Sequence, residues 1–167
     1  MVVREHNTVR EGILGGVLSG AAIAVWLFIV DTISRRPFFT PDVLGSGLLR
    51  FLGAPRMTDT VAMHVAIYTL FHFAAFAIIG VIFIWIAHQA RRTPAVLAGF
   101  LIFFVVAEVG FYGLAAMLSA NSDLGSIAWY QIMVANVLAS LVMFWFVWYR
   151  HPELKGQFTS ALEGTDD

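Results

Sequence analysis

The sequence has no cysteine and few charged residues, and each absence excludes certain classes of protein. Without cysteine, there are no disulfide bonds, no cysteine-ligated zinc, no iron–sulfur clusters and no thiol catalysis. Only 13% of the 167 residues are charged, whereas about a quarter are charged in ordinary soluble domains. The formal net charge is −1, and no run of lysine and arginine is long enough to bind a phosphate backbone. We therefore exclude nucleic acid as a partner.

Hydrophobic residues take the place of the missing charges. They make up 59% of the chain, and the mean hydropathy is +0.80, which indicates more apolar surface than a soluble fold can bury. A membrane-crossing helix needs ~20 mainly apolar residues at a rise of ~1.5 Å per residue. Four stretches meet this requirement, at about residues 12–33, 60–88, 94–118 and 124–149. The sequence predicts an all-α integral membrane protein: a four-transmembrane-helix bundle in one domain, 1–152, followed by a polar, disordered tail, 153–167.

The connection between the first two stretches is long enough to contain a short helix. Thr40-Pro41-Asp42 is typical of a helix start, and Gly53-Ala54-Pro55 is typical of a helix end. Because apolar residues lie between them, we expect a short interfacial helix on the membrane surface or dipping into it. The alternative is an irregular lid packed on the bundle.

The distribution of basic residues predicts the orientation of the chain. Four spans place both termini and the second connection on one side of the membrane. That side holds six of the ten basic residues, and the other side holds four. The six are Arg4, Arg10, Arg91, Arg92, Arg150 and Lys155, and the four are Arg35, Arg36, Arg50 and Arg56. Since basic residues are enriched in cytoplasmic loops, we expect both termini in the cytoplasm.

Small residues recur every four positions along the first stretch. Gly12, Gly16, Gly20 and Ala24 form a ridge that lets another helix backbone approach closely. We expect this ridge to pack a second helix of the same bundle. A homodimer interface would use the same pattern.

Ionisable residues at membrane depth are costly and usually face a protein interior or a cavity. Asp31 and His64 lie at one depth, toward the non-cytoplasmic side, and His72 and Glu108 lie near the centre. Tyr68 lies four residues from both His64 and His72, and Tyr112 lies four residues after Glu108, so each shares a helix face with them. Gln131 and Asn136 lie on the fourth stretch. The sequence predicts a polar column that opens to the non-cytoplasmic side, with ligand-binding or proton-relay candidates Asp31, His64, Tyr68, His72, Glu108, Tyr112, Gln131 and Asn136.

The matched depth of His72 and Glu108 predicts that these two side chains face each other. A buried pair of this kind fixes the register of two helices, and a purely structural role remains an alternative to a functional one. If the column is functional, removal of both side chains abolishes that function without unfolding the protein.

Three functional hypotheses fit these residues. The first is a small accessory or small-ligand-binding subunit of a larger membrane complex, because no catalytic signature is present. The second is a redox protein that holds haem or quinone through His64 or His72, although both histidines lie on one stretch whereas bis-histidine haem needs ligands from two helices. The third is a metal site built from Asp31, His64, His72 and Glu108. It is weakened because the two histidines lie ~12 Å apart along the helix axis.

One segment also resembles a known pattern. Gly20-Ala21, Trp26, Asp31, Pro37, Thr40-Pro41 and Leu44-Gly45 follow one another in the first stretch and its connection. In these positions the chain resembles a family of small four-span bacterial membrane proteins. The resemblance implies a multi-pass protein of the bacterial inner membrane, and it implies no particular activity.

Overall fold

The computed structural model describes residues 8–53, 60–90 and 129–150. In these residues the chain forms four helices and no strand. They are α1 (Thr8–Ile33), α2 (Phe39–Phe51), α3 (Val61–Ala90) and α5 (Trp129–Arg150). The described part of the chain confirms the all-helical prediction.

Three of the helices, α1, α3 and α5, are long and apolar enough to cross a membrane, and α2 is not. They correspond to the first, second and fourth predicted stretches. α1 extends four residues further toward the N-terminus than the predicted stretch at 12, and its first turn contains the acidic residue Glu11, which favours a helix start. The third predicted stretch, 94–118, and the tail, 153–167, lie outside the described residues.

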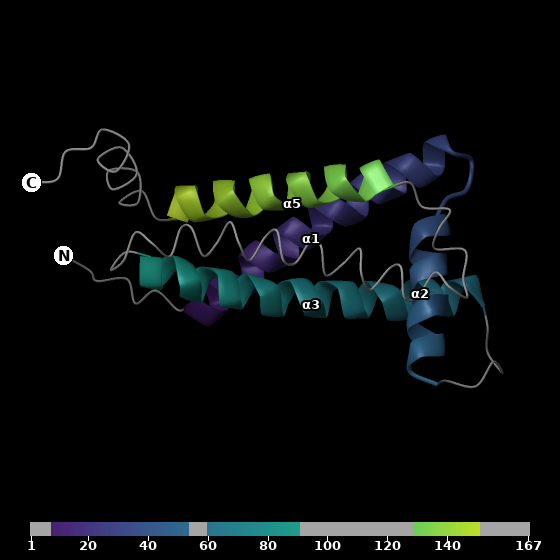
Figure 1. The fold of residues 1–167 in the computed structure, drawn as a ribbon, viewed down its shortest axis with the longest axis horizontal. Coiled ribbons are helices and arrows are strands. Elements are labelled where there is room, and N and C mark those ends of the chain that lie inside the picture. The colour runs from purple at the N-terminus through teal and green to yellow at the C-terminus, as the bar shows by residue number, and fades with distance from the viewer. Residues whose placement is uncertain (1–7, 54–59, 91–128, 151–167) are drawn as a thin grey trace, which may run out of the picture.

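The helices are arranged as three long elements with a short one across their end (Figure 1). α1 crosses obliquely between α3 and α5 and packs on both of them. α3 and α5 run in the same direction, opposite to α1. α2 lies roughly perpendicular to α3 and packs on it, at the end where α1 finishes and α3 begins.

The contact between α1 and α3 is closest near the start of α1, where glycines from both helices meet. A Cβ atom on Gly16 would overlap the backbone carbonyl of Phe76, and one on Gly80 would overlap the carbonyl of Gly12. At Gly20 a Cβ would already meet side chains, with the Phe76 Cβ atom at 3.1 Å and the His72 Nε2 atom at 3.4 Å. The predicted small-residue ridge therefore lies on the α1–α3 contact, and side chains enter between the two helices only from Gly20 onward.

A tight turn connects α1 to α2 and directs the chain across the end of the long helices (Figure 1). Arg35 adopts a left-handed conformation with φ 57°. Its N–H group donates to the carbonyl of Thr32 at 3.0 Å, and the N–H group of Arg36 donates to the carbonyl of Asp31 at 2.9 Å. These two bonds form a Schellman motif, in which glycine is the usual left-handed residue. Phe38 is also left-handed, with φ 67°, so two non-glycine residues adopt this conformation within one turn.

Helix α5 packs on α1. Ile23 and Leu27 of α1 are buried against Ala135 and Ala139 of α5. Beside this cluster, the indole N–H group of Trp26 donates to the backbone carbonyl of Gln131 at 3.0 Å. An indole N–H group that is shielded from water needs such a partner. The bond also ties the first turn of α5 to the C-terminal part of α1.

Candidate ligand-binding site

A cavity of about 290 Å³ lies where α1 and α3 separate and α2 begins. Its walls are mostly apolar, and a few polar side chains lie among them. The lining residues are Ile23, Ala24, Val25, Leu27, Phe28 and Asp31 from α1, Phe38, Thr40 and Pro41 at the start of α2, and Val65, Tyr68, Thr69, His72 and Phe73 from α3. Val25, Phe28 and Thr69 are exposed, so the cavity opens to the protein surface.

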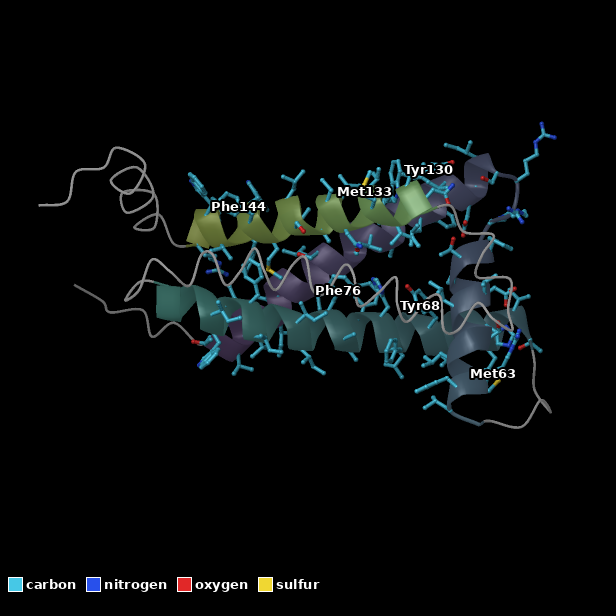
Figure 2. The ribbon with its side chains drawn as sticks, viewed as in Figure 1. Met63, Tyr68, Phe76, Tyr130, Met133 and Phe144 are labelled. Atoms are coloured by element: carbon cyan, nitrogen blue, oxygen red, sulfur yellow. The ribbon has the colours of Figure 1, made fainter. Side chains whose placement is uncertain are left out.

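His72 forms the inner end of the cavity. Its Nε2–H group donates to the carbonyl of Gly20 at 2.9 Å, and the side chain of Tyr68 lies 3.4 Å from its Nδ1 atom. A carbonyl can only accept, so the Nε2 atom carries the proton and Nδ1 of the neutral ring is an acceptor. Tyr68 and Phe76, which are labelled in Figure 2, lie against this ring, with ring centroids 5.5 Å and 4.7 Å from it.

Asp31 lies at the outer end of the cavity and caps α2. Its carboxylate accepts the backbone N–H group of Thr40 and the Thr40 hydroxyl, each at 2.8 Å. Phe38, at the N-cap position, has no side-chain oxygen for this purpose. The N–H groups of Phe39 and Asp42 donate to carbonyls within the turn, and Pro41 has none. Asp31 therefore completes the hydrogen bonding of the start of α2, and its negative charge lies at the positive end of that helix.

His64 anchors α2 to α3 just outside the cavity. Its Nδ1 atom lies 2.6 Å from an oxygen of the Asp42 carboxylate. Close by, Gly45 lies directly on the backbone of His64, and a Cβ atom there would overlap the His64 carbonyl. Two side chains therefore bind α2 to its neighbours: Asp31 binds it to α1, and His64 binds it to α3.

The predicted site residues divide into three groups in the structure. Asp31, Tyr68 and His72 line one cavity. His64, Gln131 and Asn136 do not line it: His64 bonds to Asp42, and the other two lie on α5. Glu108 and Tyr112 lie outside the described residues, so the proposed contact between His72 and Glu108 stays a prediction.

Sequence reasoning missed the partners that α2 supplies. Thr40 and Asp42 bind Asp31 and His64, yet the sequence identified them only as a helix start. Glu11, in the first turn of α1, is also buried and was not singled out. Thr40 and Asp42 are polar residues expected near the depth of Asp31 and His64, and this could have indicated that the two pairs bind each other.

The described residues contain no group of three or more histidine, aspartate or glutamate side chains that could hold a metal ion. His64 and His72 bond to different helices, and Glu108 of the predicted metal set lies outside the described residues. The Nε2 atom of His72, through which a histidine commonly binds haem iron, is occupied by the Gly20 carbonyl.

Comparison with known proteins adds no relative from which a function could be transferred. No family model, no curated protein and no solved structure matches the chain. The interpretation of the cavity therefore rests on its own geometry.

Proposed function

We propose that the chain is a multi-pass integral membrane protein that binds a small, mainly apolar ligand in the cavity between α1, α2 and α3. The observation that carries this proposal is the cavity itself, about 290 Å³ in volume, whose described lining is apolar except at His72, Tyr68 and Thr69 and at Asp31 and Thr40. Ligand sites in proteins are typically apolar pockets with a few polar groups that orient the ligand, and this volume lies at their small end.

The apolar surface of the long helices supports membrane insertion. Large hydrophobic side chains on all three are more than half exposed, among them Val25, Leu70, Ile78, Leu141 and Trp145. Such a surface is unfavourable in water and favourable in lipid. α3 and α5 run in the same direction, so in a membrane the chain must cross once more between them (Figure 1). The stretch 94–118 is apolar enough to supply that crossing, which gives the four-span bundle.

The same geometry bears on how a ligand enters. The opening at Val25, Phe28 and Thr69 lies on membrane-crossing helices, so it faces hydrocarbon rather than water. A ligand that partitions into lipid reaches the cavity from the side. We propose that the protein acts as an accessory or ligand-binding subunit of a larger complex in the bacterial inner membrane, since it has no catalytic motif. Redox binding of quinone fits the same cavity, whereas haem would require His72 to give up its bond to Gly20.

The proposed orientation, with both termini cytoplasmic, predicts which single cysteines are accessible from outside. The chain has no cysteine of its own, so each introduced thiol is the only one. Ser34 is exposed in the turn between α1 and α2. We expect an impermeant maleimide to label Ser34→Cys in intact cells and to label Ser160→Cys only after lysis. The opposite pattern would reverse the orientation.

Filling the cavity tests the ligand-binding proposal. Thr69 lines the cavity, and its hydroxyl donates to the carbonyl of Val65 in its own helix, at 2.6 Å. We expect Thr69→Phe to block the binding of phenethyl alcohol and phenethylamine without unfolding the protein. Binding is measured by calorimetry in detergent, with empty micelles as the blank.

Thr32 provides a matched control. It is exposed and makes the same kind of bond, to the carbonyl of Phe28 at 2.7 Å, but it does not line the cavity. Thr32→Phe should therefore bind both compounds as the wild-type protein does. If neither compound binds the wild-type protein beyond partition into micelles, or if both variants bind equally, the proposal fails.

A further inference from the structure

We propose that the ligand of this cavity is a lipophilic amine in its protonated form, with its ammonium group beside Asp31 and its apolar body between α1 and α3. This inference rests on the proposed function and adds the chemical class of the ligand. It follows from three features of the lining: the hydrogen-bond donors, the charge and the aromatic rings.

The hydrogen-bond donors in the described lining of the cavity already have acceptors within the protein. The Thr40 N–H and hydroxyl groups both donate to Asp31. The Thr69 hydroxyl donates to the carbonyl of Val65, and the Nε2–H group of His72 donates to Gly20. The hydroxyl of Tyr68 lies 3.4 Å from the Nδ1 atom of His72, which carries no proton, so this hydroxyl donates to His72. The side-chain oxygen atoms of these residues can still accept hydrogen bonds. The cavity therefore favours a ligand that donates hydrogen bonds.

The lining also carries the negative charge of Asp31. Asp31 is 4% exposed, and the described residues that line the cavity include neither lysine nor arginine. The two bonds from Thr40 use only part of the capacity of a carboxylate, which accepts at about four positions. The positive end of α2 offsets the charge in part, but a buried carboxylate is best stabilised by a full positive charge. A bound ammonium group would supply that charge.

The walls next to Asp31 suit the remainder of such a ligand. Phe28 and Phe38 lie with ring centroids 5.3 Å apart, and Phe73 and Tyr68 lie on the opposite wall. The faces of aromatic rings attract cations. A carboxylate ligand would meet Asp31 and acceptors only, and a neutral alcohol would leave the charge of Asp31 unbalanced.

The experiment compares three probes of one shape on the full-length protein in detergent: phenethylamine, phenethyl alcohol and hydrocinnamate. We expect phenethylamine to bind at least about tenfold more tightly than phenethyl alcohol, as for a desolvated charge pair. Hydrocinnamate should not bind. Equal binding of amine and alcohol would overturn the inference and leave the proposed function intact, whereas binding of no probe would remove both.

The variant Asp31→Asn separates the charge from the capping role. The side-chain carbonyl of asparagine can still accept the Thr40 N–H group, and its amide can donate to the Thr40 hydroxyl, so α2 stays capped. The preference for the amine should then disappear while phenethyl alcohol still binds. Asp42→Asn removes one negative charge from α2 outside the cavity and should keep the preference.

If Asp31→Asn retains the preference for the amine, Asp31 is only a cap and the inference is wrong. If Asp42→Asn also loses the preference, the effect is a general one of net charge, which overturns it equally. Should Asp31→Asn fail to fold, the selectivity of the wild-type protein among the three probes decides by itself.

Discussion

Replacing Gly16 by leucine is expected to have the largest effect on folding of any single change in α1. Gly16 lies on the backbone of α3, and even a Cβ atom would overlap the carbonyl of Phe76. Rotation of a side chain cannot relieve an overlap with backbone, so the two helices must move apart. We expect a loss of at least about 3 kcal/mol in the free energy of unfolding, seen as a lower melting temperature and a lower folded yield in detergent.

Ala74→Leu is the matched control for this change. Ala74 is an exposed small residue on α3, the helix that Gly16 contacts. A leucine at this position adds similar volume without meeting a neighbouring backbone, so its melting temperature should stay close to that of the wild type. Equal melting temperatures of Gly16→Leu and wild type would show that the α1–α3 contact is not as close as described.

Replacing Asp31 by alanine is expected to have the second large effect. The change leaves the N–H group and the hydroxyl of Thr40 without their acceptor at a buried position, where Thr40 is 3% exposed. Loss of a helix cap and of a buried hydrogen-bond partner together costs about 2 to 4 kcal/mol. The melting temperature measured in detergent should fall accordingly, and protease sensitivity should increase within α2.

Asp31→Asn should keep most of the stability that the alanine variant loses, because its amide can pair with both groups of Thr40. A second control is Asp42→Ala, which removes the contact with His64 but none of the bonds at the start of α2 that Asp31 makes. If Asp31→Ala melted at the temperature of the wild type, the cap would have no energetic role.

The long helices could be predicted from the sequence because their signal is local. An apolar run of sufficient length specifies a helix in lipid, and α1, α3 and α5 follow from such runs. The glycine ridge could also be predicted, because Gly12, Gly16 and Gly20 repeat every four residues and therefore share one helix face. The ridge predicted a close contact but not which helix would supply the other side.

The contacts of α2 could not be predicted, because they depend on how the chain turns. Depth along the helices placed Asp31 beside His64, but depth does not show what lies between two helices. In the structure the turn through Arg35 and Phe38 brings α2 between them, and each of the two residues binds α2 instead. Left-handed arginine and phenylalanine are uncommon, so this turn could not be expected from the residues that form it.

The most direct test of ligand binding is methyl NMR of the protein in detergent during titration with phenethylamine. Methyl groups of Ile23, Leu27 and Val65 line the cavity, whereas those of Ile84 and Val147 are buried elsewhere in the bundle. We predict saturable shifts of the first three signals, unchanged signals from the other two, and no saturable shifts in Thr69→Phe. Shifts that grow linearly without saturation, or that are equal at all five positions, would contradict a ligand site in this cavity.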